Sequence, residues 1–195
     1  MAAHVSDLGL LPADVSDMVV TSEHVSDASG VTHVYLRQRL RGIDVFGGEM
    51  NVNLGRDHSI LSLDHSFVRD LAGAANARVP AHGAVQAARS AARALRLEVT
   101  RPITVVRRAR GPARETTLTG GGISVRAIPA RLVYLPVAAE ARLSWLLEIE
   151  EPGGLHLWSV VVDAETGDVL KTLDHVAEGG AVARRARPGP MGGVS

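Results

Sequence analysis

The chain lacks cysteine, has few aromatic residues, and carries no excess charge of either sign. Its 195 residues contain no Cys, 3% aromatic residues, and 21 Lys+Arg against 21 Asp+Glu. The absence of cysteine excludes disulfides and thiolate metal sites. The balanced charge argues against a general nucleic-acid-binding protein, for which a basic excess is expected. Because aromatic residues are scarce, the core must consist mainly of Val, Leu, Ile and Ala.

The sequence also lacks a long apolar segment and the features of a secretory signal. The N-terminus, MAAHVSDLGLLPADVSD, has no basic start and no extended apolar run. A transmembrane helix needs about 20 mostly apolar residues, and a signal peptide needs a basic start followed by an apolar core. We therefore expect neither a membrane segment nor a signal peptide in this chain.

Alternating apolar residues in the first third predict a small antiparallel sheet. Within residues 31–54, VTHVYLRQRLRGIDVFGGEMNVNL, apolar side chains recur at every second position. That period is typical of half-buried strands. Gly42 supplies the permissive backbone for a tight reversal, and Gly47-Gly48 indicates a bulge or bend. A last strand of this half is expected from Ile60 to Val68.

The second half is predicted to begin with a helix and continue with strands. Residues 80–97 are rich in alanine, which favours helix, and an apolar stripe is expected at Val85, Ala88, Ala92 and Leu95. Arg89, Arg93 and Arg96 lie mostly off that stripe. Strands are expected at 103–106, 125–135 (broken by Pro129), 143–149, 155–162 and 169–173, with 143–149 and 155–162 forming a hairpin.

Two groups of motifs resemble a known propeptide. The first is an aromatic strand containing a Gln, followed by GIDV (42–45) and NVN (51–53). It resembles the FTP domain at the start of the propeptide of fungalysin- and thermolysin-type zinc metallopeptidases. The second runs from ARLVYLPV (130–137) through LSWLLEI (143–149) to WSVVVDAETGDVL (158–170) and is similar to a PepSY-like subdomain. The motif positions taken as structurally important are His33, Tyr35, Gln38, Gly42, Ile43, Val45, Asn51, Asn53, Trp145, Asp163 and Gly167.

The predicted fold class is α+β, with two small subdomains that are each a curled antiparallel sheet with a helix packed on it. Residues 1–69 are assigned to an FTP-like subdomain, 70–79 to a linker, and 80–175 to a PepSY-like subdomain. Residues 176–195, rich in Gly, Ala, Arg and Pro, are expected to form a disordered tail.

The resemblance implies a role in protein interaction. Such propeptides help the attached peptidase to fold and keep it as an inactive zymogen. The implied partner is a metallopeptidase catalytic domain, joined in cis in the family and met in trans by a separate chain. The implied location is extracellular, although no signal peptide is visible. We expect no cofactor in this chain, because zinc belongs to the family's catalytic domain, and no nucleic-acid partner.

The zinc-binding signature of the family's catalytic domain is absent from the sequence. That signature, HExxH, places two His one helical turn apart on zinc with Glu as general base, and no Glu follows any of the eight His here. We therefore predict that the chain is not an enzyme and assign no catalytic, cofactor-binding or metal-binding residue. The chain is interpreted as a truncated or orphan propeptide.

Two alternatives stay open at the level of sequence. One is a fragment of a zinc metalloendopeptidase precursor. The other is a stand-alone PepSY-like binding module that inhibits proteases.

Overall fold

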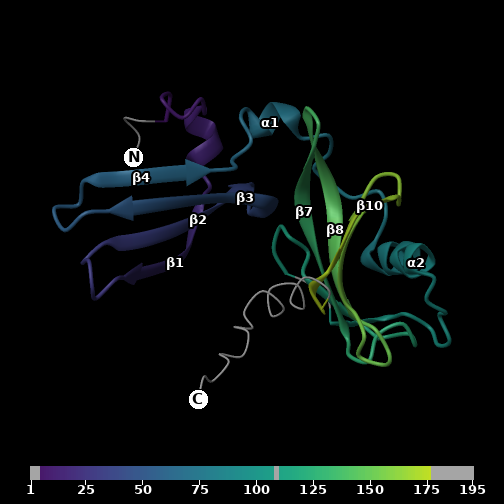
Figure 1. The fold of residues 1–195 in the computed structure, drawn as a ribbon. Coiled ribbons are helices and arrows are strands. Elements are labelled where there is room, and N and C mark those ends of the chain that lie inside the picture. Colours follow the sequence, from purple (N-terminus) through teal and green to yellow (C-terminus); the bar gives the residue numbers. More distant parts are fainter. Residues whose placement is uncertain (1–4, 108–109, 177–195) are drawn as a thin grey trace, which may run out of the picture.

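A computed structural model describes residues 5–107 and 110–176, in which β-sheet is the main regular structure (Figure 1). The strands are β1 (Val19–Val25), β2 (Thr32–Leu40), β3 (Ile43–Leu54), β4 (Ile60–His65), β5 (Val105–Arg107), β6 (Thr116–Leu118), β7 (Ile128–Val137), β8 (Glu140–Glu150), β9 (Leu157–Asp163) and β10 (Val169–Asp174). The helical segments are the 3₁₀ turn η2 (Pro12–Val15), the short α1 (Leu71–Ala74) and α2 (Ala84–Leu95). No helix among the described residues is long and apolar enough to cross a bilayer.

Hydrogen bonding links all ten described strands into one mixed sheet. The main path is β1-β2-β3-β7-β8-β9-β10, with β4 paired to β3, and β5 joined to β7 through β6. Every pairing is antiparallel except that of β3 with β7. In Figure 1, β1 to β4 lie on one side of the molecule and β7, β8 and β10 on the other, with α2 beyond them. The predicted hairpin of 143–149 with 155–162 is confirmed as β8–β9.

The predicted fold of two subdomains, each a curled antiparallel sheet with a packed helix, is wrong. The chain instead forms a large mixed sheet and is 13% helical. The reason lies in β3, where pairing with β2 jumps from Arg37↔Glu49 to Arg39↔Asp44. Residues 45–48 therefore have only Gln38 opposite them and leave the β2 ladder. Val45 pairs in parallel with Tyr134 of β7, and this contact joins the two sets of strands.

The first four strands also close their core without a packed long helix. The inward side chains of β2 and β3 form a buried cluster with residues from before and after the sheet, namely Val5, Leu10, Leu36, Met50, Val52 and Phe67. The N-terminal segment with η2 thus covers the face for which the sequence predicted a helix. An alternating strand pattern shows that one face is buried but does not show what covers it.

The only α-helix longer than one turn in the described residues, α2, packs on the larger part of the sheet through alanines. Its fully buried apolar positions are Ala84, Ala87, Ala88, Ala91 and Ala92, in the same core cluster as the inward residues of β7, β8 and β9. Two residues of the predicted stripe, Ala88 and Ala92, lie on this buried face, whereas Val85 and Leu95 are only partly buried. Small side chains let the helix lie close to the sheet, and the longer ones lie at the borders of the contact.

Two further expectations differ from the structure in detail. β7 continues through Pro129, which lies opposite Thr117 of the short strand β6, whereas the sequence predicted a break there. The segment 70–79, expected as a linker, contains α1 and pairs with β8 through Ala75 and Ala141. The predicted division into domains stays a prediction. The predicted tail lies outside the described residues except for Val176.

Candidate functional site

Gln38 ties the bend in the sheet to the chain that leaves β4. Its side chain is fully buried. Its Oε1 accepts a hydrogen bond from the N–H of Val68 at 2.7 Å, and its Nε2 donates to the carbonyl of the same residue at 2.8 Å. A third, longer bond runs from Nε2 to the carbonyl of Asp14 at 3.3 Å. The motif Gln is thus a structural clamp, and every one of these partners is main chain.

Asp14 also bonds to main chain near Gln38, and it was not identified from the sequence. Its carboxylate is 3% exposed and accepts main-chain hydrogen bonds from Leu11, Asp70 and Leu71 at 2.8–3.0 Å. Two of these donors stand at the start of α1, where orphan N–H groups need acceptors. The only local signal was Pro12 followed by an acidic residue, which is a common helix start and says nothing about the distant partners.

Gly42 makes the reversal between β2 and β3, as predicted. Its φ of +76° lies in the left-handed region that favours glycine. Its N–H donates to Asp17 Oδ2 at 2.7 Å, and a Cβ at this position would lie 2.8 Å from Pro112 Cγ. The turn therefore contacts two segments distant in sequence, and glycine meets both the backbone and the space requirement.

Ile43 and Val45, at the start of β3, belong to the large core cluster and not to the N-terminal one. Directly between them, Asp44 lies in a group of arginines. Its carboxylate accepts a hydrogen bond from Arg131 of β7 at 3.2 Å and is within 2.9 Å of Arg39 and 3.6 Å of Arg37. The start of β3 thus links β2 to β7 through both its apolar and its charged side chains.

The open face of the first four strands carries the other motif residues of this region. His33 Nδ1 lies 2.6 Å from Asn53 Oδ1, and Asn53 Nδ2 donates to Ser62 at 2.8 Å. His24 stacks on His33 with centroids 4.7 Å apart and on Tyr35 at 5.9 Å. These residues form a cross-strand ladder of polar rings and amides on β1, β2, β3 and β4.

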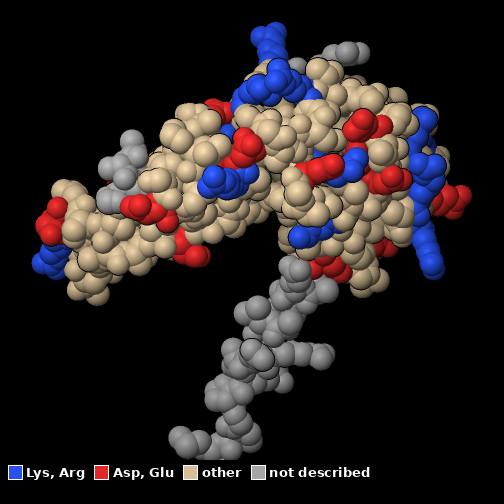
Figure 2. All heavy atoms as spheres, turned by 90° about the horizontal axis from the view of Figure 1, so that it is seen from above, with Lys and Arg blue, Asp and Glu red and all other residues tan. Residues whose placement is uncertain are grey.

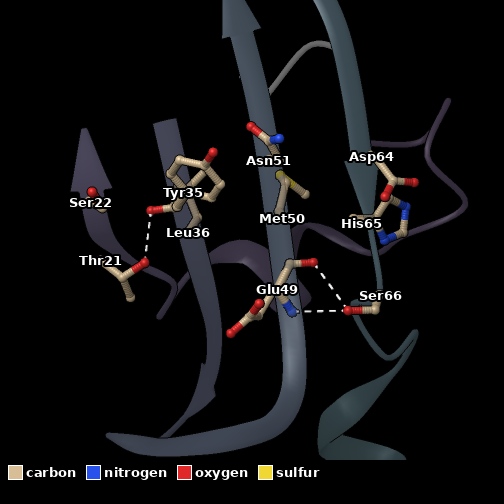
Figure 3. Close-up of a pocket in the computed structure, with 10 residues that line it drawn as sticks. All are labelled: Thr21, Ser22, Tyr35, Leu36, Glu49, Met50, Asn51, Asp64, His65 and Ser66. Carbon is tan, nitrogen blue, oxygen red and sulfur yellow. Dashed lines mark hydrogen bonds between the residues drawn. The ribbon is translucent and has the colours of Figure 1, made fainter. Parts of the chain in front are cut away.

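A polar trough of about 420 Å³ crosses the same four strands (Figure 3). Its lining includes two carboxylates, those of Glu49 and Asp64, and the Tyr35 ring. The side-chain oxygen of Asn51 is buried without a hydrogen-bond partner. Ser66 Oγ accepts from the N–H of Glu49 at 3.0 Å and donates to main-chain oxygens. In the described part of the chain Ser66 Oγ bonds to backbone and not to a histidine, so it lacks the neighbouring base that activates a nucleophilic hydroxyl.

The motif residues of the second half occupy structural positions in and around the β8–β9 hairpin. Trp145, 3% exposed, donates from Nε1 to the carbonyl of His82 at 2.8 Å and so ties β8 to the start of α2. Asp163 ends β9 and accepts hydrogen bonds from Arg142 Nε at 2.5 Å and from two N–H groups of the following turn. Gly167 completes that turn at a φ of +80°. The bond to Asp163 raises the pKa of the Arg142 guanidinium.

A serine–histidine contact that the sequence did not suggest lies between β9 and the end of β10. Ser159 Oγ is 2.8 Å from His175 Nε2. A catalytic pair also needs a group that orients the histidine. Among the described residues the nearby carboxylate, Asp174, instead binds His156 at 2.6 Å. We therefore interpret the Ser159–His175 contact as a cross-strand hydrogen bond.

The structure does not gather the chemistry-bearing side chains into one centre. Within residues 5–107 and 110–176, no group of three or more His, Asp or Glu could hold a metal ion. The motif positions fall into two sets, one at β2 and β3 and the other around β8 and β9, and their contacts are main-chain hydrogen bonds, packing and cross-strand side-chain pairs.

Comparison with known protein families matches the region that contains the first set of motif positions. Residues 16–67 match the fungalysin/thermolysin propeptide motif. This range contains the Gln38 clamp, the Gly42 turn and the open face with the polar trough. The matched range therefore begins directly after η2 and contains strands β1 to β4. It ends at Phe67, directly before Val68, whose main chain bonds Gln38.

Similarity to curated proteins extends well beyond the propeptide motif. Extracellular metalloproteinase MEP of Leptosphaeria maculans is 33% identical over 163 residues, covering 82% of this chain and 25% of that protein. Extracellular metalloproteinase mep of Aspergillus niger is 33% identical over 159 residues, covering 80% and 25%. Extracellular metalloproteinase 10 of Uncinocarpus reesii is 32% identical over 162 residues, covering 81% and 25%. The chain thus spans about a quarter of the length of these relatives. The PepSY-like subdomain expected for residues 80–175 stays a prediction.

Proposed function

We propose that this chain is the propeptide region of a fungalysin-like extracellular zinc metallopeptidase precursor, and that it inhibits the peptidase and assists its folding. The observation that carries the proposal is the propeptide motif at residues 16–67, set within a similarity that covers four-fifths of the chain and a quarter of each metalloproteinase. The zinc and the catalytic residues would belong to the peptidase domain. The extracellular location follows the names of the relatives.

The structure suggests how such a chain can act without chemistry of its own. A folded sheet whose turns are held by hydrogen bonds presents a preformed surface. A surface that binds the folded peptidase more tightly than its unfolded chain shifts the equilibrium toward the folded form. The same binding blocks substrate when the occupied area overlaps the cleft. Folding assistance and inhibition are then two consequences of one interface, whether the peptidase is joined in cis or met in trans.

The direct test is inhibition in trans. The purified 195-residue chain is titrated against the mature metalloproteinase MEP of L. maculans with a fluorogenic peptide substrate. We expect saturable inhibition that approaches one chain per enzyme. Gel electrophoresis of the same samples shows whether the chain stays intact. A cleaved chain would act as a competing substrate and not as an inhibitor. Full activity at every concentration of folded, intact chain contradicts the proposal.

Refolding tests the second part of the proposal. Denatured MEP is diluted into buffer with or without the chain, and activity is measured after the two proteins have been separated. A higher recovered activity with the chain than with the same mass of serum albumin supports folding assistance. Equal recovered activity with the chain and with albumin contradicts folding assistance. Inhibition is then tested by the titration alone.

A further inference from the structure

Two exposed arginines on α2 and one directly after it have no carboxylate partner in the described part of the chain. Arg89 and Arg93 lie one helical turn apart on the same side of α2, and Arg96 caps the helix in a left-handed conformation with a φ of +57°. None of the three forms an ion pair within the described residues. Figure 2 shows Lys and Arg atoms gathered at the end of the molecule where Figure 1 places α2.

Helix stability explains only part of this arrangement. Cations near the C-terminal end of a helix are stabilised by the helix dipole, which accounts for Arg93 and Arg96. Arg89 lies in the middle of α2, and its like charge four residues before Arg93 disfavours the helix. Arg93 also donates to Ser90 Oγ at 3.0 Å, which restrains this guanidinium beside the helix.

A groove with an apolar floor runs beside these arginines. It has a volume of about 890 Å³ and is lined by Gly83, Val85, Gln86, Arg89, Ala92, Arg93, Leu97 and Val99. Its apolar side chains come from both α2 and the segment after it, and Val99 is 41% exposed. The lining contains two guanidinium groups and no carboxylate. An apolar floor with a basic rim is complementary to an extended or helical segment with acidic and apolar residues.

We propose that this groove, named here the α2 groove, is the docking site for an acidic, partly apolar segment of a protein partner. The proposal rests on the proposed function for the identity of that partner, which is the metallopeptidase domain. Two observations favour protein over nucleic acid or a membrane surface: the apolar floor, and the balanced charge of the whole chain, with 21 basic and 21 acidic residues. Docking would neutralise Arg89 and Arg93 and cover Val99.

The first experiment measures inhibition of L. maculans MEP by charge-reversed variants of the full chain. Arg89→Glu with Arg93→Glu is expected to raise the inhibition constant about tenfold or more, because two attractive contacts become repulsive. The matched control is Arg56→Glu with Arg78→Glu, which makes the same charge change at exposed positions that do not line the groove and is expected to leave inhibition unchanged. Circular dichroism and the melting temperature confirm that both variants are folded.

The second experiment tests the groove without the enzyme. The ¹⁵N-labelled chain is titrated with the amphipathic peptide acetyl-ELLEELLE-amide and with its Gln counterpart, acetyl-QLLQQLLQ-amide. Shifts confined to residues 83–99, seen with the acidic peptide and lost in the Arg89→Glu/Arg93→Glu variant, support the proposal. No shifts in that range overturn it, as do equal shifts with the Gln peptide. Equal shifts with duplex DNA or anionic vesicles overturn it in favour of a general polyanion surface.

The two experiments separate the groove from the proposed function. If the wild-type chain inhibits MEP and the groove variant inhibits it equally well, the groove proposal is overturned and the proposed function stands. If the wild-type chain does not inhibit MEP at all, the proposed function fails, and the peptide titration alone decides whether the α2 groove takes acidic segments.

Discussion

At the scale of single residues, two buried polar side chains, Gln38 and Asp14, pair with main chain that no strand ladder serves. Gln38 bonds both polar groups of Val68, and Asp14 bonds the start of α1. A buried donor or acceptor left without a partner costs about 1–3 kcal/mol. Gln38 therefore matters through its contacts with the segment that leaves β4, which lies directly beyond the matched range.

Replacing Gln38 with Leu tests the clamp. Leucine has a side-chain volume similar to that of glutamine. The substitution removes both hydrogen bonds to Val68, so the N–H and the carbonyl of Val68 lose their partners. We expect the free energy of unfolding in urea to fall by about 2–4 kcal/mol. The matched control is Gln86→Leu, at an exposed position of α2, which should change stability by less than about 0.5 kcal/mol. Equal effects of the two substitutions would refute the clamp.

At the scale of elements, the turn at Gly42 shows what a sequence pattern can and cannot supply. Alternation predicted β2 and β3, and Gly42 was predicted at their reversal because glycine adopts positive φ. The contacts of that turn with Asp17 and Pro112 could not be predicted, since they depend on where distant segments of the chain lie. Motif spacing identified the structural positions, whereas the partners that give them their roles came only from the fold.

The same limit explains why only half of the predicted stripe on α2 is buried. Val85 and Leu95 are more hydrophobic than alanine, so they were included in the expected face. The buried apolar positions are all alanines, Ala88 and Ala92 of the predicted stripe among them, because close approach of helix and sheet favours small side chains. The closing of the β1–β4 core by the N-terminal segment was missed for a related reason: residues 1–18 show no strong period of their own.

Gly42→Val is expected to lower stability through both backbone and space. Valine is disfavoured at positive φ, and its Cβ would approach Pro112 within 2.8 Å. The two effects together should cost about 2–3 kcal/mol, measured as a lower melting temperature. Gly83→Ser is the control, because Gly83 is the N-cap of α2 with a φ of −85° and no atom near its Cβ position. An unchanged melting temperature for Gly42→Val would refute the assigned turn.

The end of β10 contains a carboxylate, Asp174, that is hydrogen-bonded to a histidine. His156 Nδ1 lies 2.6 Å from Asp174 Oδ2, and this hydrogen bond lowers the pKa of the Asp174 carboxyl, with a smaller contribution from the N–H of Val176. A carboxyl whose pKa is lower in the folded state stabilises it above the unfolded pKa of about 4. That contribution is lost as the pH falls through the lower, folded pKa.

His156→Phe keeps a ring beside Trp158, on which His156 stacks at 5.0 Å, and removes the hydrogen bond. The pKa of Asp174 should then rise toward its ordinary value, which a carboxyl-detected NMR titration can follow. Asp57, whose pKa is lowered mainly by hydrogen bonds from Ser59 and less by the nearby His58, does not contact His156 and serves as an internal reference. An Asp174 titration that is the same in both proteins would contradict the assigned cause.

At the scale of the whole molecule, one junction turns two sets of strands into a single sheet. Val45 pairs with Tyr134, Tyr134 donates from its hydroxyl to Ala77 at 3.0 Å, and Asp44 accepts from Arg131. Burial raises the pKa of the Tyr134 hydroxyl, so it stays a donor at neutral pH. The junction places the propeptide-motif face and the α2 groove on one continuous framework.

Asp44→Asn tests the junction. The substitution removes the charge shared by Arg37, Arg39 and Arg131. Arg37 keeps its ion pair with Glu49, whereas Arg39 and Arg131 lose their anion. We expect wild-type protein to unfold in one transition, and the variant to lose about 1–3 kcal/mol and to separate the transitions of the two sets of strands. Tryptophan fluorescence reports on β8 and β9 alone, and far-ultraviolet circular dichroism on the whole sheet. Two separate transitions already in the wild type would contradict the single framework.

The central claim is that this framework recognises a folded metallopeptidase, and calorimetric titration of mature L. maculans MEP with the folded chain tests it most directly. The account predicts saturable binding with one chain per enzyme and a negative heat-capacity change from burial of apolar surface. A folded chain that produces no binding heat at any temperature, and no complex in size-exclusion chromatography, would contradict it.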